Sequence, residues 1–416
     1  MSRLEELTNE ASAMRKDISA MAGQGGRTPL GELLQRYCPD GVEYKALGEA
    51  TIMKRGTSAT KGMMQEGDIP VISGGRQPAF YCDQANRTGE TITVAGSGAG
   101  AGYVQYWNEP IFVCDAFSIQ GDNTLLTKYI YYCLASIQEK IYSTKKGGGV
   151  PHVHISSIDK FEIPVPPMPV QEEIVRILDS FTELQAELQA ELQKRKQQYN
   201  YYLDNLLSFN RGGQTEVRWM KLKDVATQWY RGAGIKREEV SEDGMPCIRY
   251  GEIHTTYNIW FDDCISHTDE SKQVSRKYAE KGDILFAITS EDIPFVGNSV
   301  AYLGDERILV GGDIVVMKHN QDPKYMAYAL STSDAIKQKG KGKVKSKVVH
   351  TNVPSLQEIV IPIPSMTEQK RIASILDMFD TLTNDLAAGL PAEIEKRRQQ
   401  YEYYRDKLLT FKRKGA

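Results

Sequence analysis

The sequence predicts an α+β fold in which two similar mixed α/β domains are separated by two long antiparallel helices that form a coiled coil. Two observations predict this fold. One helical sequence occurs twice, and a segment of strand and turn character precedes each copy. Each copy has a proline-rich lead, an I-L-D-x-F motif and a tail of the form Q-Q-Y-x-Y-Y-x-D-x-L-L-x-F. The copies occupy residues 163–209 and 361–411.

In both copies, apolar side chains recur every three or four residues, which is typical of a coiled-coil seam. The first seam comprises Ile174, Ile177, Phe181, Leu184, Leu188, Leu192, Tyr199, Tyr202 and Leu206. The second seam comprises Ile372, Ile375, Phe379, Leu382, Leu386, Ile394, Tyr401, Tyr404, Leu408 and Phe411. The segment Gly389-Leu390-Pro391 predicts a break in the second helix, because proline removes a backbone hydrogen bond and clashes with the preceding turn.

The segments before the two helical copies each contain short strand-like runs and one predicted helix. The first segment has strands at Ile69–Ser73, Thr91–Ala95, Tyr103–Tyr106 and Ile111–Cys114, and a helix at Thr127–Tyr142. The second has strands at Pro246–Tyr250, Ile284–Ile288, Ser299–Tyr302 and Ile314–Met317, and a helix at Lys324–Lys339. Because the loops between matching runs diverge, we expect one shared fold with two different recognition surfaces.

The repeat is circular, with a pseudo-twofold relation between its halves. Leu33–Glu49, near the start, resembles Leu206–Asp224, the junction that follows the first helical copy. The chain therefore begins part-way through a repeat. We expect five segments: an N-terminal amphipathic helix and linker (1–29), a first α/β domain (30–164), a first spacer helix (165–210), a second α/β domain (211–364) and a second spacer helix (365–416).

Composition excludes several classes of protein. A chain of 416 residues with 41% hydrophobic and 25% charged residues is typical of a soluble globular protein. It has no apolar run of the length that a membrane helix needs. The cysteines form no C-x-x-C pair, which indicates reduced thiols and a cytoplasmic location. The net charge of −3 means that DNA binding would depend on local patches or on a partner.

The sequence offers no catalytic motif. Gly96–Gly102 is rich in glycine but lacks the G-x-G-x-x-G register, and no G-x-x-x-x-G-K-[ST] motif occurs. His152 and His154 would share one strand face, but no third metal ligand is evident. We therefore predict no catalytic residue and no metal site in this chain.

Six lysines alternate along one segment near the end of the second domain. They are Lys337, Lys339, Lys341, Lys343, Lys345 and Lys347. An extended strand would point all six the same way, as a phosphate-binding edge requires. A solvated loop is the alternative for such a charge run. Lys145 and Lys146 stand at the matching place before the first proline-rich lead, and this repetition favours DNA contact.

Arginine and glutamine side chains in both domains are further candidates, because arginine suits the guanine edge and glutamine suits the adenine edge. The dipeptide Arg55-Gly56 in the first domain matches Arg231-Gly232 in the second. The candidates are Arg55, Arg76 and Gln77 in the first domain, and Arg231, Lys236, Arg237 and Arg249 in the second.

The first helical copy contains a duplicated tetrapeptide, Gln185–Leu188 and Gln189–Leu192. One interpretation is a run of good helix formers with no further role. The other is a ruler between two DNA-reading domains. Four residues change a helix by roughly 6 Å, which is close to two base-pair steps of DNA. They also nearly complete one helical turn, so the seam keeps facing its partner.

These features together resemble the specificity subunits of type I restriction–modification enzymes. The resemblance is carried by the helical motifs I-P-x-P…E-E-I-V-R-I-L-D-x-F and Q-Q-Y-x-Y-Y-x-D-x-L-L-x-F. It is also carried by the start C-P-D-G-V-E-Y-K-A-L-G-E and the spacer L-Q-A-E-L-Q-A-E-L. It covers nearly the whole chain. The spacer and the helix ends are most similar to the IC group.

The resemblance implies that the two α/β domains are target recognition domains, each reading one half of a split DNA sequence. The helices would set the spacing between the half-sites and dock two modification subunits, which supply S-adenosylmethionine and adenine-N6 methyl transfer. Two restriction subunits would add ATP-driven translocation and Mg²⁺-dependent cleavage, and this chain would be non-catalytic. The expected docking side chains are Tyr199, Tyr202, Leu206, Tyr401, Tyr404 and Leu408.

Two other classes of protein stay open at this point. A coiled-coil adaptor would use the helices alone and never touch DNA. A stand-alone DNA methyltransferase or nuclease would need a catalytic motif, which the sequence does not supply.

Overall fold

The structure, a computed structural model, describes residues 28–63, 65–209, 217–343, 347–384 and 389–415. The chain forms two compact units. Unit 1 comprises residues 1–189 and 394–416, and unit 2 comprises residues 190–393. The predicted N-terminal helix, together with Lys345 and Leu386, lies outside the described residues. The five segment boundaries predicted from the sequence stay predictions.

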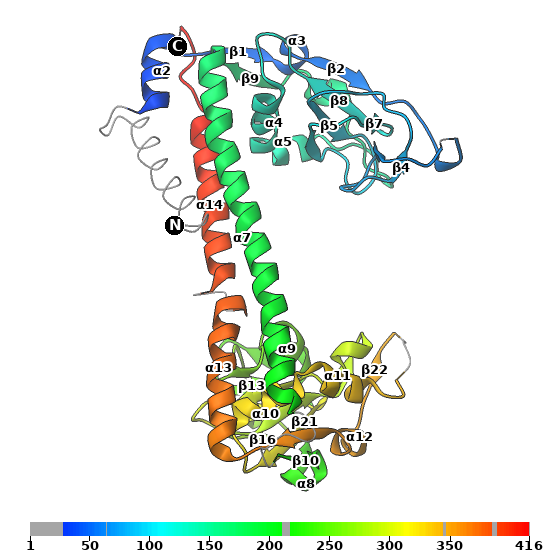
Figure 1. Cartoon of the computed structure of the whole chain (residues 1–416), viewed down its shortest axis with the longest axis vertical. Coiled ribbons are helices and arrows are strands. Elements are labelled where there is room, and N and C mark those ends of the chain that lie inside the picture. Colours follow the sequence, from blue (N-terminus) through cyan, green and yellow to red (C-terminus); the bar gives the residue numbers. More distant parts are fainter. Residues whose placement is uncertain (1–27, 64, 210–216, 344–346, 385–388, 416) are drawn as a thin grey trace. The chain divides into compact units, whose positions relative to one another are not determined.

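Unit 1 is a mixed α/β body with a pair of helices packed on it (Figure 1). Its sheets have the strand orders β1-β9, β2-β8-β5-β6 and β4-β3-β7. Its strands are β1 (Glu43–Ala46), β2 (Ile52–Arg55), β3 (Ile69–Ile72), β4 (Phe80–Cys82), β5 (Thr91–Ala95), β6 (Val104–Trp107), β7 (Phe112–Val113), β8 (Ala116–Gln120) and β9 (Glu162–Val165). Its helices are α2 (Pro29–Tyr37), α3 (Leu47–Ala50), α4 (Thr127–Ser136), α5 (Gln138–Tyr142), α6 (Ile155–Ile158), and parts of α7 (Met168–Ser208) and α14 (Leu390–Leu408).

Unit 2 repeats this plan with longer sheets. Their strand orders are β10-β23, β11-β21-β17-β19-β14, β12-β15-β13-β20-β16 and β18-β22. Its strands are β10 (Arg218–Lys221), β11 (Ala226–Arg231), β12 (Val240–Ser241), β13 (Met245–Ile248), β14 (Trp260–Phe261), β15 (Ser266–Thr268), β16 (Tyr278–Ala279), β17 (Ile284–Ala287), β18 (Thr289–Ser290), β19 (Ser299–Tyr302), β20 (Ile308–Val310), β21 (Ile314–His319), β22 (Val349–His350) and β23 (Val360–Ile363). Its helices are α8 (Leu222–Val225), α9 (Tyr250–Thr255), α10 (Pro323–Leu330), α11 (Ser333–Gly340), α12 (Val353–Gln357), α13 (Met366–Asn384) and the end of α7.

The strand register shows that the two bodies share one topology. Strand β1 pairs antiparallel with β9, and β10 pairs in the same way with β23. Each unit has a short parallel pair at the matching place, β3 with β7 or β13 with β20, and unit 2 has a further parallel pair, β14 with β19. The strands β3, β5, β6, β7, β13, β17, β19 and β21 all overlap the predicted runs. Each predicted helix before the spacer is also present, although each is split in two, as α4 and α5 or as α10 and α11.

Unit 1 is closed by the far end of the chain, as a circular repeat requires. After α14, the backbone returns to the start of β1. The amide of Val42 donates to the carbonyl of Lys412 at 2.8 Å, and the amide of Lys414 donates to the carbonyl of Val42 at 3.0 Å. Gly41 allows this approach, because a Cβ there would lie 2.5 Å from the Lys412 carbonyl oxygen. Leu408 and Leu409 are buried in the same core as Leu30 of α2.

Each unit contains one pair of helix segments, drawn from different copies of the repeat. In unit 1, Phe181 of α7 lies 5.5 Å from Tyr404 of α14, measured between ring centroids. In unit 2, Phe379 of α13 lies 5.0 Å from Tyr202 of α7. The phenylalanine of each I-L-D-x-F motif therefore meets the last tyrosine of the other copy's Q-Q-Y-x-Y-Y motif. This reciprocal contact confirms that the copies pair with each other.

The aspartate of the same motif fastens the α/β body to its helix. Asp179 accepts hydrogen bonds from Lys128 Nζ at 2.8 Å and Tyr132 Oη at 2.5 Å, both on α4. Asp377 accepts from Lys324 Nζ and Tyr328 Oη on α10, both at 2.7 Å. We call these two clusters the aspartate joints.

Burial, followed by the hydrogen bond to the aspartate, raises the pKa of both joint tyrosines well above the ordinary value. Tyr132 and Tyr328 therefore stay neutral donors at physiological pH.

A glutamine one helical turn from the start of each spacer helix makes a second matched contact. The side-chain amide of Gln171 donates to the carbonyls of Pro166 and Thr124, and its oxygen accepts from the Leu126 amide. Gln369 bonds the Pro364 carbonyl and the Asp322 amide in the same way. The proline-rich leads are thus held where the helix begins.

The predicted seam is largely confirmed, with two corrections. Tyr202 was expected in the seam of α7, but it is 42% exposed and the neighbouring Leu203 is buried instead. On α7, the seam leucines Leu184, Leu188 and Leu192 are buried. On α13, Leu382 was expected in the seam, but it is 39% exposed and Thr383 is buried instead. The predicted break is also confirmed, since Gly389 is not helical and α14 begins at Leu390 with Pro391 in its first turn. Proline is tolerated there because the first-turn amides have no intrahelical acceptor.

All six cysteines are free thiols, four of them buried. Within the described ranges, no helix is long and apolar enough to cross a membrane.

Removing an aspartate joint should destabilise the unit that contains it. Asp377→Ala leaves Lys324 and Tyr328 without their acceptor, and we expect a loss of about 2 kcal/mol, the range for hydrogen bonds to a charged group. Urea unfolding of the full chain measures this loss. Glu368→Gln is the matched control, because Glu368 forms only an exposed pair with Arg371, worth less than about 0.5 kcal/mol. Equal losses in both variants would contradict the role of the joint.

Candidate DNA interface

The Arg-Gly dipeptide at the end of β2 and the one at the end of β11 have the same surroundings. A Cβ on Gly56 would lie 2.1 Å from the Cys114 carbonyl oxygen, and one on Gly232 would lie 2.2 Å from the Gly311 carbonyl oxygen. Only glycine fits where two backbone segments approach so closely. The preceding arginine is thereby fixed at the mouth of a hollow in each unit.

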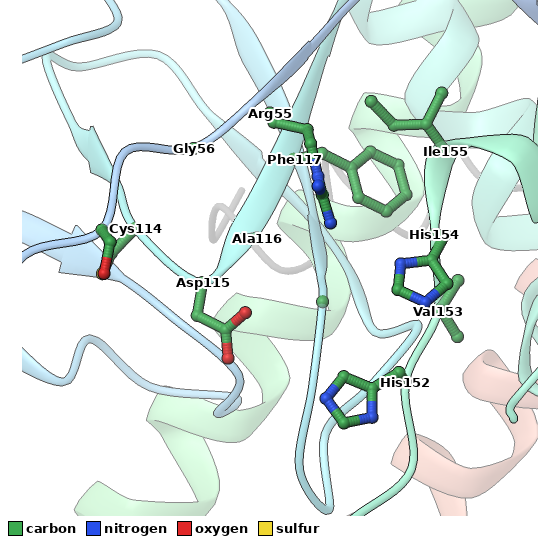
Figure 2. Close-up of a pocket in the computed structure, with 12 residues that line it drawn as sticks. Arg55, Gly56, Cys114, Asp115, Ala116, Phe117, His152, Val153, His154 and Ile155 are labelled. Carbon is green, nitrogen blue, oxygen red and sulfur yellow. The ribbon is translucent and has the colours of Figure 1, made fainter. Parts of the chain in front are cut away.

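The hollow of unit 1 has a volume of about 280 Å³ and lies between the end of β2, the start of β8 and the segment before α6. Figure 2 shows Arg55, Asp115, His152 and His154 on its walls. The Ser97 hydroxyl donates to the Asp115 carboxylate. The His152 and His154 rings stack with their centroids 6.1 Å apart. The hollow therefore presents donors from arginine and histidine beside one carboxylate.

The hollow of unit 2 is larger, about 550 Å³, and holds three arginines: Arg231, Arg237 and Arg249. Arg231 forms an ion pair with Asp313 at 2.8 Å and also donates to the Gly312 carbonyl. Arg249 lies 3.8 Å from Glu252, and its Nε is buried without a hydrogen-bond partner. The carboxylates of Asp313 and Glu252 line the same hollow, so its cations exceed its anions by one. This excess favours an anionic ligand, and backbone phosphates of DNA suit this charge. We call this the arginine hollow.

The remaining predicted DNA-binding residues lie elsewhere on the surfaces of the two units. Arg76 lies over the Tyr103 ring, 5.0 Å from its centroid, and Lys145 lies over the Tyr142 ring at 4.1 Å. Gln77 is exposed. Lys146 exchanges backbone hydrogen bonds with His152, which connects its loop to the hollow of unit 1. Lys236 is exposed and pairs weakly with Glu239, at 3.9 Å. Contact with DNA stays a prediction for each of them.

The expectation that the six alternating lysines all point the same way is wrong. Lys337 and Lys339 belong to α11, where successive side chains do not alternate between two faces. Lys339 is only 5% exposed, its ammonium donates to Ser299 Oγ at 3.2 Å, and its stem packs on Gly297. It is therefore corrected from a DNA contact to a core residue. Lys341 and Lys347 are exposed, Lys343 is half-buried, and their role stays a prediction.

Most of the predicted docking side chains on the helices pack within this chain. Tyr199 and Leu408 are buried in the two main cores, and Leu206, Tyr401 and Tyr404 pack against the same cores. Tyr199 and Leu408 are corrected, because a side chain covered by its own core cannot form a docking surface. Tyr202 is 42% exposed and stays a candidate.

Two tyrosines of the repeated tail that were not predicted to lie in the seam are also exposed. Tyr201 and Tyr403, which are equivalent in the two copies, are 65% and 58% exposed.

His152 and His154 of the unit 1 hollow are potential metal ligands by residue type alone. In the part of the chain that the structure describes, no group of three or more His, Cys, Asp or Glu side chains is placed to hold a metal ion.

A family model described as the type I restriction modification DNA specificity domain matches residues 39–195 and 215–396. The chain belongs to this family. It is 31% identical, over 89% of its length and 94% of the relative's, to the EcoR124I/EcoR124II specificity subunit of Escherichia coli. It is 28% identical, over 93% of its length and all of the relative's, to a putative type I specificity subunit of Haemophilus influenzae.

Solved structures of the same class share the fold. A specificity subunit from M. genitalium matches 89% of the chain and 96% of its own length, with a TM-score of 0.56 and 19% identity. A chain from a structure of a type I restriction–modification system matches 90% of this chain and 98% of its own length, with a TM-score of 0.59 and 15% identity.

These matches confirm the predicted resemblance, the fold class and the function. The chain is a DNA sequence-recognition subunit of a type I restriction–modification system, and it is not itself the catalytic subunit. Such a subunit works in a complex with other subunits and DNA. The matched residues include both arginine-bearing hollows, which the sequence signalled through the repeated Arg-Gly dipeptide.

Charge-neutralising variants should distinguish the surface lysines near α11, which we expect to contact DNA, from the buried Lys339. Lys337→Gln with Lys341→Gln and Lys343→Gln should weaken DNA binding by the assembled complex and lower its salt dependence. Lys339→Met should leave both unchanged, because Lys339 is buried. Filter binding between 50 and about 200 mM salt measures this difference. A larger effect from Lys339→Met than from the triple variant would restore the original prediction.

The same Lys339→Met variant should also change how the free energy of unfolding depends on pH. Burial lowers the pKa of Lys339 from 10.5 to about 7. Between these values the unfolded chain binds more protons, so stability rises with pH across this window. Removing the amine should stabilise unit 2 at pH 7 and flatten that rise. Urea unfolding at several pH values between 7 and 10 tests it, and an unchanged slope would contradict burial of a titrating amine.

Proposed function

We propose that the two units read the two halves of a bipartite DNA target and that α7 contributes to the spacing between them. The single observation that supports this best is the pair of matching hollows behind Gly56 and Gly232, with an arginine at each mouth. One fold, used twice with different linings, suits two different half-sites. The net charge of −3 fits a protein that shares its grip on DNA with partners.

The same proposal includes the partners. Two modification subunits dock on the helices and bring S-adenosylmethionine for adenine-N6 methyl transfer. Two restriction subunits bring ATP and Mg²⁺ for translocation and cleavage, and the assembly works in the cytoplasm. Tyr201, Tyr202 and Tyr403 support docking on the helices, because large exposed aromatic side chains are enriched at protein interfaces.

Selection from a randomised duplex library by the assembled complex tests the bipartite target. The expected result is two specified blocks separated by unspecified positions, and a single uninterrupted block would contradict the proposal. Arg55→Gln and Arg231→Gln should each weaken binding to all sequences and reduce the salt slope by about one per lost phosphate contact. Lys281→Gln, an exposed cation outside the arginine hollow, is the control and should change neither.

Deleting Gln189–Leu192 tests the ruler. The deletion removes four residues from the continuous helix α7 and shortens it by roughly 6 Å while nearly preserving the phase of the seam. The unspecified spacer in the selected DNA should shorten by one or two base pairs, and both half-sites should stay the same. Four alanines in place of the tetrapeptide serve as the length control. An altered half-site would contradict the ruler.

A further inference from the structure

Unit 2 has a second hollow on the other side of α9 from the arginine hollow. Its volume is about 440 Å³. The two hollows share Tyr250, Gly251 and Thr255, so α9 forms the ridge between them. The second hollow is also lined by His254, Thr289, Ser290, Glu291, Asp292, Phe295 and Val348. We call it the aromatic hollow.

The lining of the aromatic hollow differs in chemistry from that of its neighbour. Tyr250, Phe295 and Val348 are 38%, 53% and 40% exposed, which is unusual for large apolar side chains gathered at one place. Glu291 and Asp292 are exposed carboxylates in the same lining. Ionised carboxylates only accept hydrogen bonds and repel phosphate. The hollow therefore suits a ligand with flat apolar faces and hydrogen-bond donors.

The backbone around the aromatic hollow is held by hydrogen bonds. Glu252 of α9 accepts from the Arg249 amide at 2.8 Å and from the Ser266 hydroxyl. The His254 Nε2 atom lies 3.0 Å from the Thr289 carbonyl oxygen, which connects α9 to β18. Its Nδ1 atom is buried without a hydrogen-bond partner. The hydrogen bonds of Glu252 and His254 fix the position of α9, as a binding site requires of its supporting elements.

Unit 1 does not share α9. The equivalent segment of unit 1, residues 73–79 between β3 and β4, is described throughout and contains no helix.

Cations are also found near the aromatic hollow. Lys347 is exposed and directly precedes Val348, which lines the hollow. Cations thus lie near this hollow, with arginines across α9 and Lys347 next to Val348 in the chain. Nearby cations suit duplex DNA, whose phosphates flank the base edges.

We propose that the aromatic hollow is the base-reading site of unit 2 and that it receives base edges bearing an exocyclic amino group, adenine N6 or cytosine N4. The inference rests on the proposed function of unit 2. The arginine hollow binds phosphate and sets position, whereas Glu291 and Asp292 accept from the amino group, as carboxylates do in the major groove. Tyr250 and Phe295 contact the apolar part of a neighbouring base edge, such as the methyl group of thymine.

The test selects DNA from a randomised duplex library with the assembled complex carrying Asp292→Ala, Glu291→Ala or Tyr250→Ala. Each carboxylate variant should lower the preference for the amino-bearing base at one or two positions of one half-site by about tenfold. Affinity for non-specific DNA should stay equal or rise, because a negative charge is lost. A merely structural role would instead lower binding to every sequence. Loss of adenine preference alone, or of cytosine preference alone, identifies which amino group is read.

Two controls make the outcome decisive. Glu242→Gln removes an exposed carboxylate of unit 2 outside both hollows and should leave the selected sequence unchanged. Arg237→Gln should weaken all sequences alike. If the three hollow variants fold, bind DNA and select the parental sequence, the inference is overturned. If the parental complex itself selects no sequence, the proposed function fails instead.

Discussion

The contact on which each unit depends is the ion pair and hydrogen bond between a helix aspartate and a lysine and tyrosine of the α/β body. Asp179 and Asp377 each bind one lysine and one tyrosine with the same pairing of oxygens, Oδ2 to lysine and Oδ1 to tyrosine. Both aspartates are partly shielded from water, with 37% and 26% of the side chain exposed. A charged bond in such a place is stronger than at an open surface and also fixes direction. This bond, together with the contact of Gln171 or Gln369, holds the body to its helix in one orientation.

This joint explains why the bodies diverge while the helices do not. The motifs I-L-D-x-F and Q-Q-Y-x-Y-Y supply the aspartate, the phenylalanine and the tyrosine of contacts that lie within the chain, Phe181 with Tyr404 and Phe379 with Tyr202. Loops on the far side of the sheets carry none of these contacts and are free to change. Part of the sequence similarity between the copies therefore reflects packing within the chain. Tyr201 and Tyr403 are also equivalent in the two copies, but their side chains are exposed.

Periodicity was sufficient to predict the fold, because strands alternate and helices repeat every three or four residues. It was insufficient wherever a side chain's partner is distant in sequence. The alternating lysines satisfied a strand pattern, yet α11 is helical and Lys339 is covered by Gly297 and Ser299, some 40 residues away. The partners in each aspartate joint are about 50 residues apart in the sequence, and a local pattern cannot predict such a contact. The Arg-Gly dipeptide was found because both copies retain it, whereas α9 was missed because only one unit has it.

The presence of α9 in one unit alone bears on how a duplicated scaffold acquires two specificities. The arginine hollow and its counterpart in unit 1 have one part in common, the tight backbone approach at Gly232 and Gly56. Backbone features of this kind suit phosphate, which carries no sequence information. The aromatic hollow depends on an insertion between β13 and β15, since α9 supplies one wall with Tyr250, while residues 289–295 supply another with Phe295. Elements that both units share thus suit the phosphate backbone, which is the same in every DNA sequence. Elements that only one unit has suit the base edges, which differ between sequences.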